Sequence, residues 1–369
     1  MKAGIVTIYD VPNFGSVLQA YATQEIINKL GFESVFIDYN RYNEWRLSHG
    51  CPTKGSKIRR CLRRLGLKAD HRKALRLEKF KKNHFKLTHT YKDLNELKNE
   101  NWNDFGLFVV GSDQVWNVNY LKGDSFYLLS FVPDGIKKIS IASSFALNSL
   151  PETFKNKFTK YLTRFDALSV RETNGKRIIN DELKIGRDVK LMLDPTLLLS
   201  NEQWHNLFDG SVKKHNEKYI LFYMWAYAFE PRPYIYEVAK YFKQKLECKI
   251  IALEGCYSSC PSNLKMENRM DSSIPDFLGL FENAELVITS SFHGTAFALN
   301  YGRPLVSILP STGDDRQMSL LESLNVANCG ITIGSDIEKI NPLYDVKSEQ
   351  SRLSALRKDN LDWIKNNSK

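Results

Sequence analysis

Short apolar runs alternate with helical apolar spacing along the first part of the chain. Residues 17–30 carry apolar side chains three and four positions apart, which indicates an amphipathic helix that Gly31 can end. Short apolar runs bounded by small or polar residues predict strands at residues 3–9, 35–37, 107–110, 138–142, 167–170 and 189–193. Because strands alternate with helical segments, the first part of the chain predicts a parallel sheet.

The same alternation begins again after a polar stretch at residues 200–217. It predicts helices at residues 233–246, 274–281 and 295–301, and strands at residues 219–223, 249–253, 286–289 and 305–309. The predicted fold class is therefore α/β, with two Rossmann-like domains that face a cleft and bind ligands at the carboxyl ends of their strands. The first domain is placed at residues 1–205, with a basic insert at 41–90. The second is placed at residues 206–369, and its last helix can pack back on the first.

Composition supports a folded protein of the cytoplasm. Hydrophobic residues make up 43% and aromatic residues 12% of the 369 positions, which is enough for a core. The first apolar run is too short for a signal peptide, and no run approaches the ~20 apolar residues of a membrane span. Of the six cysteines only Cys256 and Cys260 are close together, so we expect reduced thiols rather than disulfides or zinc ligands.

The net charge of +10 comes from one segment. Residues 54–86 hold 14 Lys and Arg against two acidic residues, so the rest of the chain is slightly negative. Within this segment Ile58, Cys61, Leu62 and Leu65 share one helical face, with Arg59, Arg60, Arg63 and Arg64 around it. Such a segment can contact anionic membrane lipids, bind nucleic-acid phosphates, or form a solvated helical lid over the cleft.

The most informative local pattern is SSFHGT at residues 290–295. It follows a predicted strand and opens a predicted helix, whose free N–H groups favour a phosphate or carboxylate. Ser291, Gly294 and Thr295 are candidate anion ligands, and His293 can donate a proton or bind an anion. A simple helix cap with a structural histidine is the alternative interpretation.

A second polar cluster, GSDQVW at residues 111–116, follows a strand of the first domain. Asp113 is a candidate base toward a hydroxyl, while Ser112, Gln114 and Trp116 would suit a sugar and its hydroxyl groups. The alternative is an aspartate that caps the next helix, with the tryptophan in the core.

Weaker signals come from three further strand ends. Arg171 follows a strand and can bind carboxylate or phosphate through two parallel hydrogen bonds, although a structural ion pair with Glu172 is equally typical. The turn with Asn13, Gly15 and Ser16 can hold an acceptor or its diphosphate, or can be only a turn. Arg316 follows the last predicted strand as a further anion ligand, or lies in a solvated loop.

Taken together, these segments resemble the polysaccharide pyruvyl transferase family. The resemblance rests on NFGS at 13–16, GSDQVW at 111–116, SVRE at 169–172, DPT at 194–196, SFHGT at 291–295 and GRP at 302–304, in the order of the family and over nearly the whole chain. The G-x-G-x-x-G and Walker A patterns are absent from the sequence, which disfavours ordinary dinucleotide or P-loop chemistry.

The resemblance implies a glycosyltransferase-B-like fold, phosphoenolpyruvate as donor and a saccharide acceptor linked to polyprenyl diphosphate. It implies that Arg171 and His293 hold the donor, and that the product is a cyclic pyruvate ketal on a surface polysaccharide or its precursor. Many members carry an arginine two positions before the histidine, where this chain has Ser291; Arg316 or Arg303 can replace it. No metal or cofactor is expected besides the co-substrate.

We therefore expect Arg171 and the helix start at Gly294 to clamp the donor anions, His293 to act as general acid or phosphate ligand, and Asp113 to act as base. A sugar-nucleotide-dependent glycosyltransferase is the alternative, since it would use the same architecture. A nucleic-acid-binding module would rest on residues 54–86 alone, and we expect no nucleic-acid partner.

Overall fold

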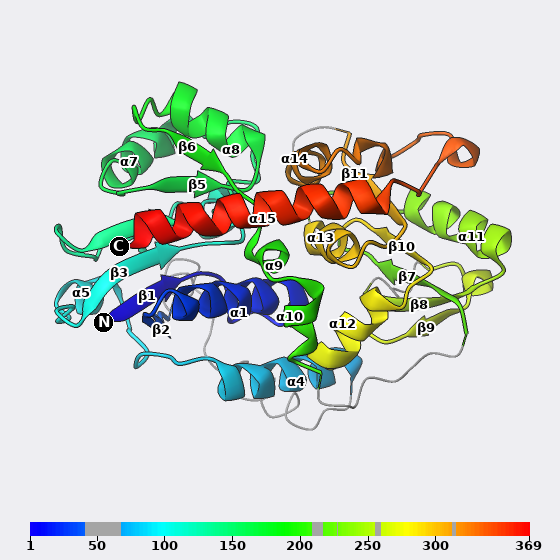
Figure 1. The fold of residues 1–369 in the computed structure, drawn as a ribbon, viewed down its shortest axis with the longest axis horizontal. Coiled ribbons are helices and arrows are strands. Elements are labelled where there is room, and N and C mark those ends of the chain that lie inside the picture. The colour runs from blue at the N-terminus through cyan, green and yellow to red at the C-terminus, as the bar shows by residue number, and fades with distance from the viewer. Residues whose placement is uncertain (41–67, 209–216, 227, 255–259, 312–314) are drawn as a thin grey trace.

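The computed structural model describes residues 1–40, 68–208, 217–226, 228–254, 260–311 and 315–369. Two α/β halves lie side by side, and the long helix α15 (Val346–Ser368) crosses from one to the other (Figure 1). The predicted architecture of two Rossmann-like halves is confirmed, because every strand pair in the named sheets is parallel.

The first half is built on a four-stranded sheet in the order β2-β1-β3-β4. Its strands are β1 (Lys2–Val6), β2 (Glu33–Phe36), β3 (Phe105–Val110) and β4 (Lys137–Ser140). A two-stranded sheet of β5 (Leu168–Val170) and β6 (Val189–Leu191) continues it through isolated bridges at Ile139–Ala167 and Ser143–Val170. The helices of this half are α1 (Phe14–Lys29), α4 (Ala69–His84), α5 (Leu94–Lys98), α6 (Val118–Leu121), α7 (Glu152–Leu162), α8 (Thr173–Arg177), α9 (Pro195–Leu198) and α10 (Asn201–His205).

The second half is built on a six-stranded sheet in the order β12-β11-β10-β7-β8-β9. Its strands are β7 (Tyr219–Tyr223), β8 (Lys249–Glu254), β9 (Met266–Asn268), β10 (Leu286–Thr289), β11 (Leu305–Leu309) and β12 (Gly330–Thr332). Its helices besides α15 are α11 (Tyr234–Leu246), α12 (Ile274–Glu282), α13 (Phe292–Asn300) and α14 (Arg316–Ser323). Short helical turns occur in both halves. The first half contains η1 (Ser125–Leu128) and η2 (Ile178–Glu182), and the second contains η3 (Ser262–Leu264), η4 (Ala327–Cys329) and η5 (Ile337–Lys339).

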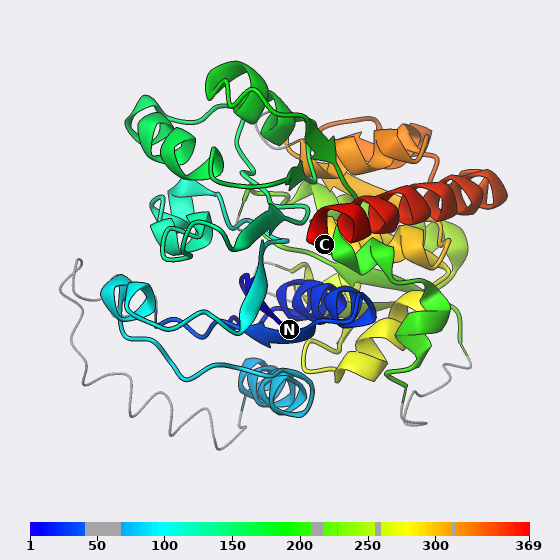
Figure 2. The same ribbon diagram turned by 60° about the vertical axis from the view of Figure 1, so that its left-hand side comes forward.

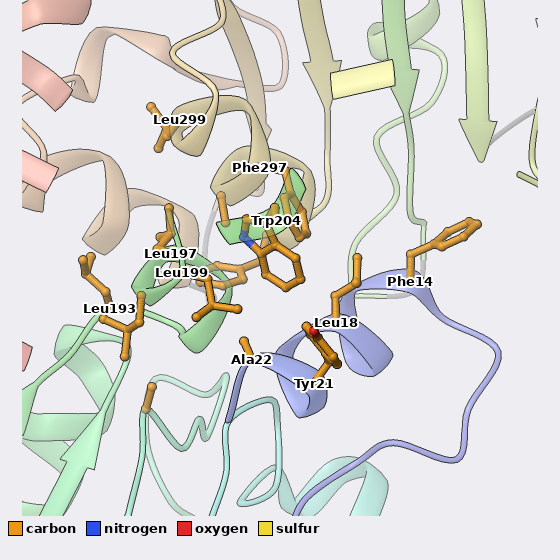
Figure 3. Packing of buried hydrophobic residues seen from close by; sticks show 14 of the residues in the cluster. Phe14, Leu18, Tyr21, Ala22, Leu193, Leu197, Leu199, Trp204, Phe297 and Leu299 are labelled. Atoms are coloured by element: carbon orange, nitrogen blue, oxygen red, sulfur yellow. The ribbon is translucent and has the colours of Figure 1, made fainter. Parts of the chain in front are cut away.

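An apolar cluster runs through both halves, around α1, α9, α10, α12 and α13 (Figure 3). Phe14 of α1 stacks on Phe277 of α12 with ring centroids 4.5 Å apart. Trp204 of α10 is fully buried and meets the ring of Phe297 in α13 edge-on at 5.5 Å. Because apolar surface from both halves is buried in one cluster, the hydrophobic effect helps to hold their relative position.

Helix α15 adds polar ties between the halves. The Oδ1 atom of Asn360 accepts a hydrogen bond of 2.8 Å from the backbone N–H of Leu193, and Asp359 pairs with Lys190 at 2.6 Å. Leu353 and Ile364 of the same helix belong to the shared apolar cluster. In Figure 2 the helix passes beside both halves, and its C-terminal end lies against the first.

Helix α4 lies in the described part of the basic insert, residues 68–90, and it also joins the halves. The Lys73 ammonium pairs with Glu254 at 2.7 Å, with both side chains buried, and lies 4.9 Å from the Phe14 ring centroid and 5.3 Å from that of Trp225. Arg72 pairs with Asp271 at 2.6 Å. Several charges of the insert are therefore used within the molecule. The predicted apolar face at residues 58–65 and its arginines lie outside the described residues.

Most predicted elements of both halves are confirmed, with differences at their ends. The strand predicted at residues 3–9 ends at Val6, and the one predicted at 189–193 ends at Leu191, because Asp194 caps α9. The helix predicted to begin at 295 begins at Phe292, because the Ser291 side chain caps it. Strands β9 and β12 were not predicted, since each has only three residues and lies at a sheet edge.

Candidate functional site

A cavity of about 780 Å³ lies between the two halves. Both of its walls are formed near the carboxyl ends of strands. The first half contributes Asn13, Ser16 and Asp113, and the second contributes Trp225 and His293. Each wall contains a point where the strand order reverses, between β1 and β3 in the first half and between β7 and β10 in the second. Open α/β sheets bind their ligands at such points.

Hydrogen bonds join the two chain segments that leave each reversal point. In the first half, Thr7 Oγ1 donates to the Ser112 carbonyl oxygen at 3.0 Å. In the second half, Ser290 Oγ accepts from the Trp225 N–H at 2.9 Å and donates to the Trp225 carbonyl at 2.8 Å. The loops that line the cavity are thereby held as pairs rather than singly.

Three helix N-termini border the cavity. Helix α1 is capped by Asn13, whose Oδ1 accepts from Ser16 N–H at 3.2 Å, and α13 is capped by Ser291, whose Oγ accepts from Gly294 N–H at 3.4 Å. Helix α14 begins with Arg316, which lines the cavity. Helix N-termini carry a partial positive charge, so their convergence favours an anionic ligand.

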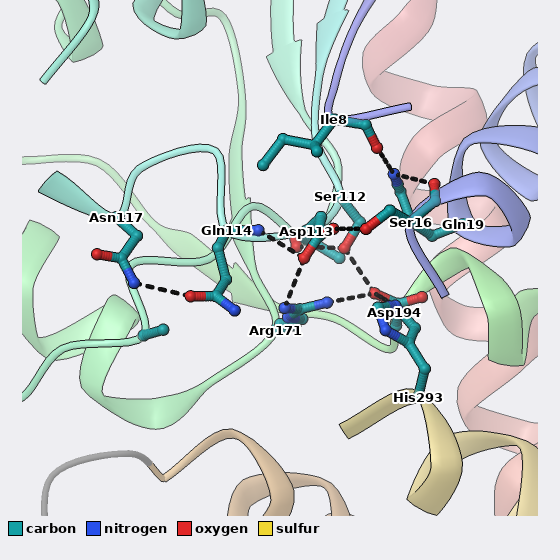
Figure 4. A network of polar contacts seen from close by, with 12 residues as sticks. Ile8, Ser16, Gln19, Ser112, Asp113, Gln114, Asn117, Arg171, Asp194 and His293 are labelled. Atoms are coloured by element: carbon teal, nitrogen blue, oxygen red, sulfur yellow. Dashed lines mark hydrogen bonds and ion pairs between the residues drawn. The ribbon is translucent and has the colours of Figure 1, made fainter. Parts of the chain in front are cut away.

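Beneath the cavity lies a buried network of charges from the loops of the first half (Figure 4). Arg171 donates to Asp194 Oδ2 at 2.8 Å and to Asp113 Oδ1 at 3.4 Å. Ser16 Oγ donates to Asp113 Oδ2 at 2.7 Å. Ser112 Oγ donates to Asp194 Oδ2 at 2.6 Å. Every member of this network comes from the loop after a strand or from the start of α1.

The network keeps both carboxyl groups ionised. Burial alone would raise the pKa of Asp113, but the charge of Arg171, that of His293 when it is protonated, and the hydrogen bonds from Ser16 and Gln114 more than offset it, so that the pKa lies below its ordinary value. Burial likewise opposes ionisation of Asp194, while His293 when protonated, Arg171, Ser112 and Thr196 bring its pKa below the ordinary value. A carboxylate of this kind is a weak base.

His293 faces this network from the second half. Its Nε2 atom lies 3.9 Å from Asp194 Oδ2 and has no hydrogen-bond partner among the described residues. Burial lowers its pKa, and although Asp194 and Asp113 act in the opposite direction, the net pKa stays below its ordinary value. The imidazole is therefore neutral near pH 7. It can accept a proton from a reacting group, or become protonated when an anion binds beside it.

Gly15 of α1 allows His293 to approach. A Cβ atom at this position would come within 2.2 Å of His293 Nδ1 and 2.4 Å of its Cγ. The imidazole therefore packs directly on the backbone of α1 from the opposite half. A glycine in the first turn of the helix is required at this position by the close approach, not by the turn itself.

Other predicted residues lie differently from the sequence-based expectation. Arg171 does not line the cavity: its side chain is 1% exposed and its guanidinium lies 4.2 Å from the ring centroid of Phe292, so it is placed to position the two aspartates instead of clamping a ligand. Trp116 is 1% exposed and its indole N–H donates to the Tyr127 carbonyl at 3.0 Å, which places it in the core rather than beside a sugar. The apolar indole fills the space beneath the loop.

Three more predicted ligands have structural partners. Ser112 is fully buried in the network, and Thr295 Oγ1 lies 2.7 Å from Ser307 Oγ in the interior of the second half. Gly294 packs so closely on Thr289 and Tyr223 that a Cβ would lie 2.2 Å from Thr289 Oγ1. In contrast, Asn13, Ser16, Gln114, Ser291 and Arg316 line the cavity as expected of ligands.

Sequence reasoning missed several residues that line the cavity. Lys122 and Lys157 are exposed at its edge, and Trp225 and Phe229 supply aromatic surface from the segment after β7. No local motif marks the lysines, which come from different helical segments. Asp194 is not among the predicted site residues, although it follows a strand as Asp113 and Arg171 do.

No group of three or more His, Cys, Asp or Glu side chains suited to a metal ion occurs in the described ranges. Within the same ranges, no helix is both long enough and apolar enough to cross a bilayer.

Comparison with known proteins identifies the relatives of this chain. A family model described as polysaccharide pyruvyl transferase matches residues 13–312. Among curated proteins no match is found. Solved structures with similar folds include MnaA of S. aureus with UDP (TM-score 0.53, 11% identity, 95% of this chain and 94% of that chain). They also include UDP-GlcNAc 2-epimerase of Neisseria meningitidis bound to UDP-GlcNAc (TM-score 0.51, 11% identity, 99% of this chain and 94% of that chain). At this identity the similarity shows the fold alone, which is glycosyltransferase-B-like.

Proposed function

The chain belongs to the polysaccharide pyruvyl transferase family, and on that premise we propose that it transfers pyruvate from phosphoenolpyruvate to two hydroxyl groups of a saccharide. The observation that supports this proposal best is the composition of the cavity, where three helix N-termini and Arg316 surround a neutral histidine. Phosphoenolpyruvate carries both a carboxylate and a phosphate, so its donor site has to neutralise two anionic groups at once.

In this proposal the donor anions bind at the starts of α13 and α14. Arg316 supplies the positive charge that the family places two positions before the histidine, where this chain has Ser291. Arg316 lines the cavity, whereas Arg171 is buried beneath Phe292 and acts through Asp113 and Asp194. The electrostatic stabilisation of the donor is thus divided between a residue that touches it and one that holds the network in place.

His293 carries the proton transfers of the reaction. As a neutral base it accepts the proton of the first attacking hydroxyl, and as imidazolium it donates this proton to the methylene carbon of the donor, which becomes a methyl group. The first carbon–oxygen bond forms at the central carbon. The second hydroxyl then forms the second bond as the bond to phosphate breaks, and its proton leaves with the phosphate.

Asp113 orients the acceptor in this scheme. Its pKa is below the ordinary value, which makes it a poorer base than the neutral imidazole, but its charge can accept a hydrogen bond from a sugar hydroxyl. Ser16, bonded to the same carboxylate, and Asn13 lie on the same wall. Trp225 and Phe229 provide the aromatic surface against which the apolar face of a sugar packs.

We propose that the acceptor is linked to polyprenyl diphosphate, since Lys122 and Lys157 are exposed at the edge of the cavity, where a diphosphate would leave it. We also propose that the positively charged residues 54–86 bring the protein into contact with an anionic membrane. Co-sedimentation with vesicles of neutral and anionic lipid tests it, and equal binding to both would contradict it.

The experiment that tests the proposed function measures phosphate release from phosphoenolpyruvate together with the mass of the acceptor. A panel of free and lipid-linked saccharides is incubated with the enzyme and each is examined for the mass gain of a pyruvate ketal. We expect phosphate release that depends on one class of acceptor. Transfer from a nucleotide sugar, without reaction of phosphoenolpyruvate, would support the alternative of a glycosyltransferase and contradict the proposal.

A further inference from the structure

A second, smaller pocket of about 240 Å³ adjoins the main cavity. Gln114, Tyr120, Ala228 and Arg316 line both spaces. The pocket therefore lies directly beside the candidate donor and acceptor residues of the main cavity. We refer to it as the side pocket.

The walls of the side pocket are rich in carboxamide groups. Gln114, Asn117, Asn119 and Asn148 all line it, together with Tyr120. A carboxamide presents a donor and an acceptor in one plane, which suits the neighbouring hydroxyl groups of a sugar. The ring of Tyr120, which is 46% exposed, offers an apolar face at the boundary with the main cavity.

Hydrogen bonds orient three of these four carboxamides. Asn117 Nδ2 donates to Gln114 Oε1 at 2.7 Å, as seen in Figure 4, and Asn117 Oδ1 accepts from the backbone N–H of Asn119 at 3.0 Å. Asn148 Oδ1 accepts from Asn174 Nδ2 at 2.9 Å. Groups that are oriented before binding lose less freedom when a ligand arrives.

The described lining of the side pocket is almost entirely uncharged. Among the described residues Arg316 is its one charged member, and it also lines the main cavity, where the proposal places the donor anions. The remaining described lining consists of carboxamide, tyrosine and small apolar side chains, which suit a neutral ligand such as a sugar.

We infer that the side pocket binds the sugar unit next to the one that receives pyruvate. The inference rests on the proposed function, and it adds that the enzyme recognises at least two consecutive sugars. At about 240 Å³ the side pocket is roughly a third of the size of the main cavity of about 780 Å³, in keeping with one further unit beside the one that reacts. The shared residues Gln114 and Tyr120 would lie beside the glycosidic bond between the two units.

The test compares acceptors of two lengths with two variants. Asn119→Ala and Asn148→Ala each remove one exposed carboxamide from the side pocket, while Asn366→Ala, on the exposed face of α15, is the matched control. We measure kcat/KM for accepted disaccharides and for the methyl glycoside of the same reacting sugar. Each pocket variant should lower the disaccharide value roughly 3–10-fold, the scale of one hydrogen bond, and leave the monosaccharide value unchanged.

Two results would overturn the inference: equal values for disaccharide and monosaccharide in the unaltered enzyme, or equal losses for both in the variants. Saturation-transfer NMR with a panel of methyl disaccharides provides a readout that needs no turnover. If no acceptor reacts, the proposed function fails, and the NMR comparison of the unaltered enzyme with Asn148→Ala still decides the side pocket. Absence of a saturation signal from every disaccharide of the panel would refute it.

Discussion

The two walls of the main cavity differ in how their charges are arranged. On the side of the first half, Asp113 lines the cavity, and the buried Arg171 beneath it pairs with both Asp113 and Asp194. On the wall of the second half, His293 and Arg316 stand at the starts of helices and line the cavity. The charges on the first side are paired with one another before any ligand binds, and those on the second are arranged to act on a ligand.

This difference distinguishes residues that stabilise the protein from residues that act in the reaction, which a sequence motif alone does not do. All five residues follow strands and all are polar, yet we expect loss of the buried Arg171 to damage mainly the protein and loss of His293 to damage mainly the reaction. Measurements of stability and turnover on the same variants therefore test the comparison directly.

The largest expected effect is on the first wall. Arg171→Met leaves Asp113 and Asp194 buried without their cation, and breaking a buried pair in this way costs about 3–5 kcal/mol of unfolding free energy. Denaturant titration measures the loss. Lys2→Met, which removes an exposed pair with Asp104, is the control and should cost no more than about 1 kcal/mol. Similar losses for both variants would remove the distinction between the walls.

The second wall should show the opposite result. His293→Gln preserves the size and polarity of the side chain but cannot carry a proton, so turnover should fall roughly 10²–10⁴-fold while the unfolding free energy changes little. Steady-state kinetics and the same denaturant titration give both values. A variant that folds normally and keeps near-normal turnover would exclude His293 from the proton transfers.

Gly15→Ala tests whether the walls must touch. The new methyl group would collide with His293, so we expect a loss of turnover of roughly 10²-fold, the effect of moving a catalytic group by about 1 Å. Alanine is a better helix former than glycine by about 1 kcal/mol, so α1 itself should not be weakened. Unchanged turnover would show that His293 can move aside without consequence.

The smallest effect is expected where the walls meet, at Glu172. Burial raises its pKa to about 7, and the charge of Asp315 acts in the same direction. The pKa of Glu172 in the folded protein lies above that in the unfolded chain. Its contribution to the free energy of unfolding is therefore fully present below about pH 4.5 and is lost as the pH rises through about 7. Glu172→Gln does not titrate and keeps an oxygen for the N–H groups of Phe145 and Ala146.

The variant should therefore be more stable than the unaltered protein at pH 8, by on the order of 1–3 kcal/mol, and closer to it at pH 5. Thermal unfolding across this pH range measures the difference. A constant difference at all pH values would show that Glu172 does not titrate in this window.

The fold could be predicted well because its strands are buried on both faces. Runs such as residues 107–110 and 286–289 are continuously apolar, and the polar segments between them mark their ends. The family likewise followed from several motifs in order. Short edge strands such as β9 carried no such pattern and were missed.

The site could be predicted only in part, because a polar residue after a strand can face either the cavity or its neighbours. Ser16, Asp113 and His293 lie at the cavity, but Arg171 and Trp116 lie below it. The sequence does not show how deeply a polar side chain after a strand is buried, because its burial depends on the packing of the loop around it. Lys122 and Lys157 reach the cavity through the tertiary fold and have no local signal.

The contacts of α15 have a consequence for biosynthesis. A ribosome completes this helix after every residue that it covers, including Leu193 and Lys190. Until residues 346–368 emerge, the edge of the first half near Leu193 lacks its cover, and the apolar cluster lacks Leu353 and Ile364. The first half therefore cannot complete its native contacts while it is being translated, and a chaperone that shields apolar surface would act on it throughout elongation.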